Sequence, residues 1–351
     1  MLFFVIGLPG RFGEWCEAAT VRLVQHAFGP AERISADTLE EISQRLLRSG
    51  ATHGVVAARD PGFRIRRALV EAGRPFVVVR DDPAASLGHL VARRGLAMAA
   101  ATRQVASSCA SLISFGESPG ALVLDAHRHG ADRLPAAAAI ARHLQLDVGD
   151  GDIADIVGSL DEGRDILDPS DAAAWWDGLD PGERAIASGA LGPYLDHSPG
   201  HVLGPITWAP ELFFIADRPG VSATEGVDIT GRARCLLHGP RIMLPPAIWS
   251  FSVAVDVSPE VAEHSILIEA AAGGGVSRTV LRPAAAGVVE ADLILGLDEL
   301  PDRRVELLLS TQRPAFAGHL TLVRVTLTPQ PPTPIDVPAE ASADDPRTVS
   351  P

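Results

Sequence analysis

A glycine-rich turn near the N-terminus is the first feature whose residue types could do chemistry. Residues 2–6 form an apolar run that predicts a buried strand, and residues 14–27 carry apolar positions at helical spacing. The turn between them reads Gly-Leu-Pro-Gly-Arg-Phe-Gly. A strand, a glycine turn and a helix present backbone N–H groups and the positive end of a helix dipole to a phosphate. The candidate phosphate-binding residues are Gly7, Pro9, Gly10, Arg11 and Gly13.

A second motif has the spacing of an acyl-transfer nucleophile. Residues 116–120 read Gly-Glu-Ser-Pro-Gly, which matches the Gly-x-Ser-x-Gly elbow of α/β-hydrolases. That elbow needs a strand before the serine and a helix after it, whereas here a predicted helix ends near Ile113 and a predicted strand begins near Ala121. Pro119 also has no N–H to offer to an oxyanion. We therefore predict a helix-to-strand turn at this motif.

The sequence offers neither a metal-ligand pattern nor a disulfide framework. Cys16, Cys109 and Cys235 are far apart in the sequence, which fits a reducing, cytoplasmic compartment. His127 and His129 could share one face of a strand, but no third ligand lies nearby in the sequence. We therefore predict no metal site.

Composition and charge narrow the classes of function. The chain has 351 residues, enough for two domains, and 46% of them are hydrophobic. Its net charge of -14 disfavours nucleic acid and anionic lipid as partners, and no apolar run approaches the roughly 20 residues of a membrane span. All 30 cationic residues are arginine. Schiff-base chemistry, pyridoxal phosphate anchoring and the lysine of Walker-type ATPases are therefore excluded.

The periodicity of apolar residues changes along the chain. Short apolar runs alternate with amphipathic helices over residues 1–160, which predicts an α/β domain with a parallel sheet. Residues 161–225 are less regular and predict a helical connector that packs on this domain. A period of two over residues 226–328 predicts an antiparallel β-sandwich of the jelly-roll type. The proline-rich residues 329–351 predict a disordered tail.

A segment in the middle of the α/β domain adds to the glycine turn. Residues 75–86 read Pro-Phe-Val-Val-Val-Arg-Asp-Asp-Pro-Ala-Ala-Ser, with Arg80 at the end of a predicted strand and Ser86 near the next helix. Together with the turn, this segment resembles sulfotransferases that use 3′-phosphoadenosine 5′-phosphosulfate (PAPS). The resemblance extends to residues 133–146 and 180–187 and covers roughly residues 1–200.

The resemblance implies a sulfotransferase-like fold and a set of site residues. The turn residues would surround the 5′-phosphosulfate, and Arg80 and Ser86 would hold the 3′-phosphate. It also implies a general base, for which His53 at the start of the second predicted strand is the candidate. An active protein would then bind PAPS, or its product 3′-phosphoadenosine 5′-phosphate (PAP), and transfer sulfonate to a carbohydrate or small hydroxyl acceptor.

The turn departs from the family pattern in three ways that oppose phosphate binding. Gly10 stands where the family has a cation, with Arg11 one place later. Phe12 crowds a loop that a phosphate must approach closely. Glu14 places a carboxylate at the helix N-terminus, where it stabilises the dipole by about 0.3–1 kcal/mol and repels a phosphate.

These departures favour a divergent, non-catalytic protein without a cofactor. We expect it to act as a binding or assembly component in bacterial surface-carbohydrate metabolism. Two alternatives remain open at this stage: an active PAPS-dependent sulfotransferase, and an oligomeric scaffold with no small-molecule ligand.

The start of the sandwich holds the most distinctive run of that domain. Residues 228–249 resemble the opening strands of jelly-roll domains, including carbohydrate-binding modules. Arginines are concentrated here in an otherwise acidic chain, so we expect a carbohydrate, a protein partner or a second copy of the chain to bind. The candidate contact residues are Arg232, Arg234, His238, Arg241 and Trp249.

Overall fold

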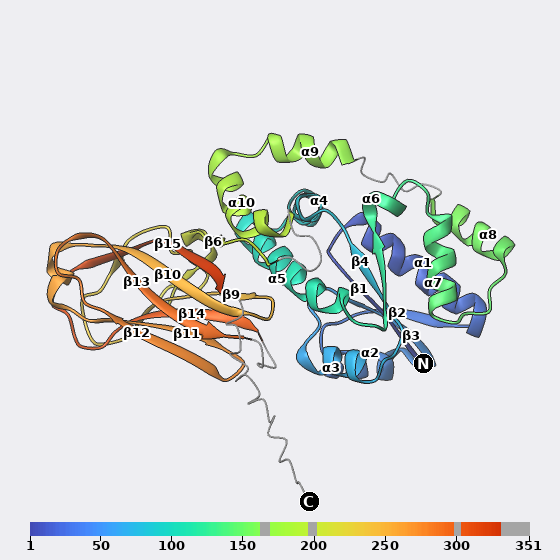
Figure 1. Ribbon diagram of the computed structural model, residues 1–351, viewed down its shortest axis with the longest axis horizontal. Coiled ribbons are helices and arrows are strands. Elements are labelled where there is room, and N and C mark those ends of the chain that lie inside the picture. Colours follow the sequence, from blue (N-terminus) through green and yellow to red (C-terminus); the bar gives the residue numbers. More distant parts are fainter. Residues whose placement is uncertain (162–168, 196–201, 298–302, 331–351) are drawn as a thin grey trace, which may run out of the picture.

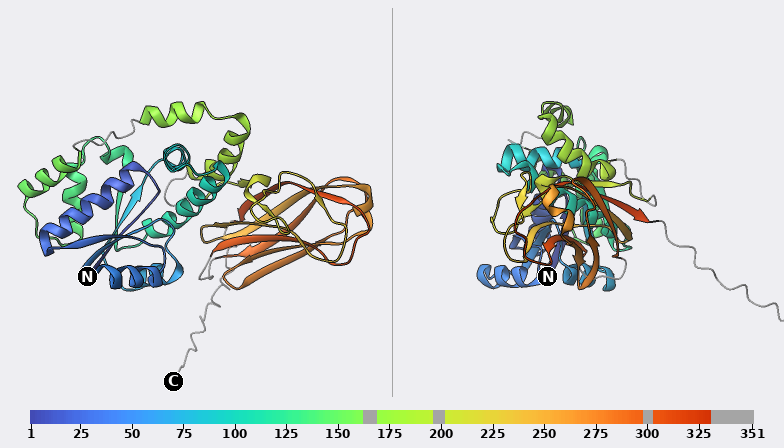
Figure 2. Two further views of the ribbon diagram at one scale, coloured as in Figure 1. Left: turned by 180° about the vertical axis from the view of Figure 1, so that it is seen from behind. Right: turned by 90° about the vertical axis from the view of Figure 1, so that its left-hand side faces the viewer.

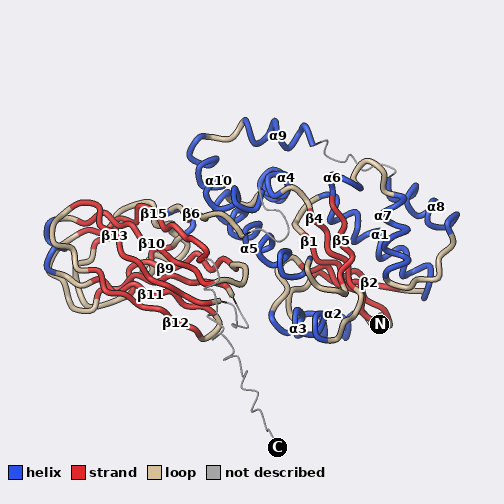
Figure 3. Tube along the Cα trace, in the orientation of Figure 1, coloured by secondary structure: helices blue, strands red, loops and turns tan. Residues whose placement is uncertain are grey.

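Two regions of different secondary structure lie side by side in the computed structural model (Figure 1). The structure describes residues 1–161, 169–195, 202–297 and 303–330. In one region helices surround a sheet, and the other consists almost entirely of strands (Figure 3). The helices α5 (Met98–Gly116) and α10 (Pro181–Leu195) lie where the two regions meet.

The N-terminal region has the alternating order of an α/β domain. Its strands are β1 (Leu2–Gly7), β2 (Ala31–Ser35), β3 (His53–Ala58), β4 (Phe76–Arg80) and β5 (Ala121–Asp125). Its helices are α1 (Arg11–Phe28), α2 (Leu39–Ser49), α3 (Phe63–Glu71), α4 (Pro83–Gly88), the π-helical turn η1 (His89–Arg93), α5, α6 (Ala126–His129), α7 (Leu134–His143) and α8 (Asp150–Asp161), followed by α9 (Pro169–Asp177) and α10. The strands form a parallel sheet in the order β2-β3-β1-β4-β5. The predicted parallel α/β fold is confirmed, and β1 is its central strand.

Both faces of this sheet are buried. Alternate residues of a strand point to opposite faces, so Val5 packs with α1, α7 and α8, whereas Ile6 packs with α2, α3 and α5. Strands covered on both faces are apolar along their whole length, which explains the continuous hydrophobic runs of the sequence. The sheet therefore holds the carboxyl ends of β1 and β4 rigidly side by side.

Two features of the α/β domain differ from the sequence prediction. The strand β2 is absent from the prediction, because Ile34 is its only buried residue and no alternation is visible in so short an edge strand. The sequence also predicts one long helix over residues 86–113. The chain instead forms α4, η1 and α5, with Gly95 in a left-handed conformation (φ 69°) after η1.

The C-terminal region is an antiparallel β-sandwich, as predicted. Its elements are β6 (Ile206–Trp208), the short 3-10 helix η2 (Pro210–Leu212), β7 (Phe214–Ile215), β8 (Val227–Asp228), β9 (Cys235–Met243), β10 (Ile248–Val257), η3 (Pro259–Glu263), β11 (Ile266–Ala272), β12 (Gly275–Leu281), β13 (Gly287–Gly296), β14 (Arg304–Thr311) and β15 (His319–Gln330). One sheet has the order β13-β10-β15-β6 with β8 paired to β15, and the other has the order β12-β11-β14-β9-β7.

The sandwich begins earlier in the chain than the predicted boundary at residue 226. β6 pairs with β15, and β7 pairs with β9, so both strands belong to the sandwich although they lie within the predicted connector. They span only three and two residues, too few to display a period of two. β15 continues to Gln330, and the remainder of the predicted tail lies outside the described residues.

The two regions also lie side by side when the molecule is seen from behind (Figure 2, left). Buried hydrophobic residues of α5 and α10 belong to the same core as those of the sandwich. Polar contacts reinforce this interface. The Arg304 guanidinium donates to Asp60 Oδ2 from Nε at 3.0 Å and from Nη2 at 2.7 Å, and Ser111 donates to Asp60 Oδ1. Ser107 Oγ accepts from the backbone N–H of Met243. Because Asp60 follows β3 and Arg304 begins β14, this ion pair ties the sheet edge directly to the sandwich.

We expect Asp60→Ala to lower the free energy of unfolding by about 2 kcal/mol, because it removes the carboxylate of a half-buried ion pair. Urea denaturation of the full chain measures this change. The control is Glu71→Ala, which breaks the exposed pair of Glu71 with Arg67 and should change stability by less than about 0.5 kcal/mol. If both substitutions lowered the free energy of unfolding by the same amount, the Asp60–Arg304 ion pair would contribute no more to stability than an exposed ion pair.

Candidate functional site

The glycine turn lies at the carboxyl edge of the sheet, between β1 and α1. Gly10 is the residue before the first turn of α1, and its carbonyl accepts from the backbone N–H of Glu14 at 2.9 Å. Gly7 lets β1 approach β4, because a Cβ there would lie 2.9 Å from the Cβ of Val79. Gly13 faces the carbonyl oxygen of Leu8 in the same way. The turn thus has the strand-turn-helix geometry that the sequence predicts.

A carboxylate lies against the turn at the N-terminus of α1. A Cβ added to Gly10 would overlap Asp81 Oδ2 and would lie 3.2 Å from Asp81 Cγ and 3.6 Å from Ser86 Oγ. Asp81 Oδ1 accepts from the backbone N–H of Asp82 at 2.9 Å. Burial raises the pKa of Asp81 to about 6. At neutral pH, a negative charge therefore lies beside Gly10, the residue before α1.

A second carboxylate, Glu14, is held at the same edge of the sheet. Its Oε1 lies 3.4 Å from Nε2 of the buried His89, and it also forms an ion pair with Arg94. The hydrogen bond to His89 lowers the pKa of Glu14 to about 2, with a further contribution from Arg94. The predicted carboxylate at the helix N-terminus is therefore present, and its partners come from η1 and the residue after it.

A buried ion-pair cluster contacts the backbone of the glycine turn. Glu17 on α1 is fully buried and pairs with Arg33 of β2 and with Arg59, which follows β3. Arg59 Nη1 also donates to the carbonyl oxygen of Leu8 at 3.0 Å. The sequence prediction did not include this cluster, because its members are far apart in the chain. A Glu at the buried face of a predicted amphipathic helix was the only available signal.

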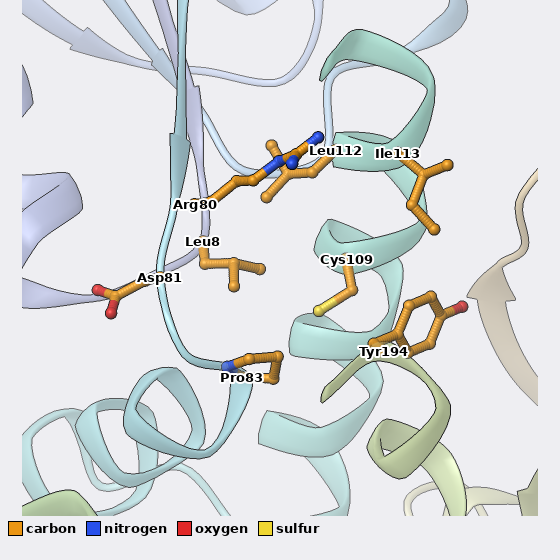
Figure 4. A pocket seen from close by; sticks show the side chains of 8 residues that line it. All are labelled: Leu8, Arg80, Asp81, Pro83, Cys109, Leu112, Ile113 and Tyr194. Carbon is orange, nitrogen blue, oxygen red and sulfur yellow. The ribbon is translucent and has the colours of Figure 1, made fainter. Parts of the chain in front are cut away.

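Arg80 lies at the end of β4, but its side chain extends away from the turn. Figure 4 shows it directed along α5, whereas Asp81 points to the opposite side of β4. A Cβ added to Gly116 at the end of α5 would overlap the Arg80 guanidinium. Arg80 lines a pocket of about 110 Å³ together with Leu8, Asp81, Pro83, Cys109, Leu112, Ile113 and Tyr194. This volume is well below the roughly 300–1,000 Å³ of pockets that enclose larger ligands.

Three residues at this edge carry a buried polar atom without a hydrogen-bond partner within the described residues. They are Arg11 (Nη2), Ser86 (Oγ) and His89 (Nδ1). Ser86 lies on α4, close to Gly10. Because its side chain is fully buried, it is not accessible to solvent. These atoms could act as donors to an anion if the Asp81 carboxylate were neutral or absent.

His53 lies at the opposite edge of the sheet. It is the first residue of β3, whereas the turn follows the last residue of β1, and these strands run parallel. Five residues of strand separate the two edges, which corresponds to roughly 17 Å. The His53 ring stacks on Phe28 at 5.4 Å between ring centroids. The structure therefore does not bring His53 together with Arg11, Arg80 or the turn.

The five residues of the sandwich that were predicted to contact a ligand or partner have different environments. Trp249 has no exposed surface, and its indole N–H donates to the Pro245 carbonyl at 3.1 Å, so its prediction as a contact residue is corrected to a core role. Its alternate neighbours on β10 also point into the sandwich, which explains its burial. His238 and Arg241 both lie close to Glu306, at 3.3 and 3.8 Å. Arg232 is exposed.

Arg234 holds a loop together. Its guanidinium donates to the carbonyl oxygens of Asp228 at 2.7 Å and Thr230 at 3.0 Å. It also lies 3.7 Å from the carboxylate of Asp217. These contacts make Arg234 a structural clamp on residues 228–230.

Comparisons with known proteins concern the fold. No protein-family model matches the sequence, and no curated protein matches it. Among solved structures, a mouse sulfotransferase complexed with PAP aligns over 56% of this chain and 84% of its own, with 10% identity and a TM-score of 0.41.

Carbohydrate-binding modules also align. TmCBM61 in complex with β-1,4-galactotriose covers 36% of this chain and 88% of its own, with 9% identity and a TM-score of 0.25. A family 16 carbohydrate-binding module covers 34% and 82%, with 13% identity and a TM-score of 0.23. These are the two classes of protein that the sequence resembles, and the likeness describes the path of the chain alone.

Two features of the described residues concern metals and membranes. The described residues contain no group of three or more His, Cys, Asp or Glu side chains arranged to hold a metal ion. None of the described helices combines the length and the apolar character needed to cross a bilayer.

Proposed function

We propose that the chain is a non-catalytic binding component, in which the α/β domain is a fixed platform and the β-sandwich contacts the ligand or partner. The observation that carries this proposal is the position of Asp81. Its carboxylate occupies the space next to Gly10 that a phosphate would need. A carboxylate and a phosphate in contact repel each other strongly when both are partly buried.

Two further observations support the platform role. Arg80, the residue expected at a 3′-phosphate, extends away from the glycine turn and lines a pocket of about 110 Å³ beside α5. The ion pair of Asp60 with Arg304 and the shared core across α5 fix the sandwich against the sheet. A platform of this kind needs no mobile lid and no cofactor. Carbohydrate is the class of ligand that we propose for the sandwich, in a bacterial surface-carbohydrate process within the cytoplasm.

Titration calorimetry with PAP at pH 7.5 tests the non-catalytic part. We expect no heat of binding for the wild-type chain up to millimolar ligand. Glu14→Thr alone should also fail to bind, because the Asp81 carboxylate remains beside Gly10. Micromolar binding by the wild-type chain that is lost in Arg80→Ala would contradict the proposal and would favour the active sulfotransferase, with Arg11 and Arg80 as its binding residues and a general base other than the distant His53.

A glycan array with the full chain tests the binding part. Retention of acidic or neutral glycans would support the role of the sandwich. A blank array, combined with a stable dimer in sedimentation experiments, would favour the oligomeric scaffold. The control is a Trp208→Ala chain, in which the loss of a fully buried core side chain should disturb the sandwich and abolish any retention.

A further inference from the structure

Phe316 has the most exposed large hydrophobic side chain of the described residues. It is 96% exposed and lies in the loop between β14 and β15. Its neighbours Ala315 and Gly318 are buried, so the backbone of this loop is packed against the sandwich while the ring is not. A fully exposed phenyl ring contributes almost nothing to the hydrophobic core. The ring is therefore free to contact a ligand without cost to the core.

The two chain segments beside Phe316 differ in length by one residue between two points of pairing. Asp228 faces His319 where β8 pairs with β15, and further along Gly231 faces Ala315 in an isolated bridge. Between these two pairs the chain advances three residues from Asp228 to Gly231 but four residues from Ala315 to His319. The segment that contains Phe316 therefore has one extra residue. Gly231 and Ala315 exchange both backbone hydrogen bonds, at 2.8 and 2.9 Å. An extra residue of this kind can redirect side chains, and Phe316 lies within this stretch.

The two loops beside the ring have little freedom to move. The Arg234 clamp holds the carbonyl groups of residues 228–230, and Asp228 Oδ1 accepts from the Thr230 N–H at 2.8 Å. On the other side, Gly318 has a φ of 131°, and a Cβ there would lie 2.9 Å from Val261 Cγ2. A ligand that binds here would therefore cost little ordering entropy in the protein.

Two arginines lie near Phe316 along the backbone. Arg232 follows Gly231, and Arg313 lies two residues before Ala315, so the bridge brings both close to Phe316. Both are exposed, and over the residues that the structure describes neither forms an ion pair or a hydrogen bond. Two neighbouring cations without a counter-ion in the described residues attract anions, even in a chain of net charge -14.

We infer that Phe316, Arg232 and Arg313 form a binding tip for an acidic sugar residue. A single isolated ring is far smaller than the roughly 1,200–2,000 Å² that a stable protein interface buries, but it matches the face of one pyranose ring. The planar guanidinium groups match a carboxylate or a sulfate ester in bidentate geometry. A uronate and a sulfated sugar share this chemistry. The inference rests on the proposed role of the sandwich as the binding module.

The position of the tip leaves room for a long glycan. Phe316 precedes β15, and β15 contacts β6 only at Val325–Leu327, roughly 25 Å further along the strand. Likewise, Arg304 contacts Asp60 at the start of β14, whereas Arg313 lies beyond its end. The strands of the sandwich extend away from the α/β domain (Figure 1), and the tip lies at the distal end of β14.

Titration calorimetry with the full chain tests this inference. The probes are trigalacturonate, a heparin tetrasaccharide and neutral maltotriose, at low ionic strength and pH 7.5; short oligosaccharides limit repulsion from the acidic protein. We expect saturable binding of at least one acidic probe and none of maltotriose. Phe316→Ala should weaken this binding about tenfold, and Arg232→Gln and Arg313→Gln about three- to tenfold each. Trigalacturonate and heparin distinguish a uronate from a sulfate ester as the preferred group.

Two matched controls are exposed side chains elsewhere on the sandwich. Val288→Ala removes an exposed hydrophobic group of β13, and Arg282→Gln removes an exposed arginine after β12; both should bind as the wild type does. Binding by Phe316→Ala that equals wild type, equal binding of maltotriose, or no binding of either acidic probe would overturn the inference. None of these outcomes depends on PAP, whose titration tests the non-catalytic proposal separately.

Discussion

Replacing Glu17 by glutamine is expected to lower the free energy of unfolding by about 3 kcal/mol, the largest effect of any polar substitution that we consider. Glu17 is fully buried between two guanidinium groups, and glutamine keeps its shape while it removes its charge. Arg59, which is only 16% exposed, would then remain in the interior without its main counter-charge. An uncompensated buried charge is more costly than the loss of a surface ion pair.

The Glu17 substitution should also loosen the glycine turn. Arg59 Nη1 donates to the Leu8 carbonyl, so a displaced guanidinium no longer holds the backbone between β1 and α1. Urea denaturation measures the stability, and amide hydrogen exchange of residues 7–13 measures the turn. The matched control is Arg33→Gln, whose side chain is about half exposed, and which should cost less than about 1 kcal/mol. A change below about 1 kcal/mol for Glu17→Gln would contradict the prediction.

Replacing Asp81 by asparagine is expected to stabilise the fold at neutral pH. Burial raises the pKa of Asp81 to about 6 from an ordinary value of 3.8, so the folded state holds this proton more tightly than the unfolded state does. The contribution of Asp81 to stability is therefore fully present below pH 3.8 and declines as the pH rises to about 6. Asparagine has no charge to bury, and we expect a gain of roughly 2–3 kcal/mol at pH 7.5 and none at pH 3.5.

Thermal or urea unfolding at several pH values measures this difference. Asp82→Asn is the control, because Asp82 caps α4 through the Ala84 N–H and asparagine caps as well as aspartate. A gain for Asp81→Asn that is equal at pH 3.5 and pH 7.5 would exclude the ionised carboxylate as its cause.

The Asp81 substitution should also admit an anion at the N-terminus of α1. With the carboxylate gone, the helix dipole and the unpartnered Arg11 and Ser86 donors face a neutral amide. We expect millimolar pyrophosphate to raise the unfolding temperature of Asp81→Asn and to leave the wild type unchanged. A shift of equal size in both proteins would show that Asp81 does not exclude phosphate.

Local features of the chain could be predicted from its sequence. The turn at residues 7–13, the end of β4 at Arg80 and the helix-to-strand turn around Ser118 follow from short-range periodicity and from the conformations of glycine and proline. The change from an α/β pattern to a period of two also predicted the two regions. Strands as short as β6 and β7 escaped prediction, because they are recognised only by their pairing with β15 and β9.

The candidate site depended more strongly on long-range contacts. The sequence alone determined that Arg11 follows Gly10, that Glu14 lies close to the start of the first helix and that the chain contains no lysine. Only the tertiary structure decided that Asp81, rather than Arg80, faces Gly10. Successive residues at the end of a strand point to opposite sides, and the packing of β4 beside β1 determines which of the two meets the helix N-terminus. That choice depends on contacts between segments about 70 residues apart, which no local pattern records.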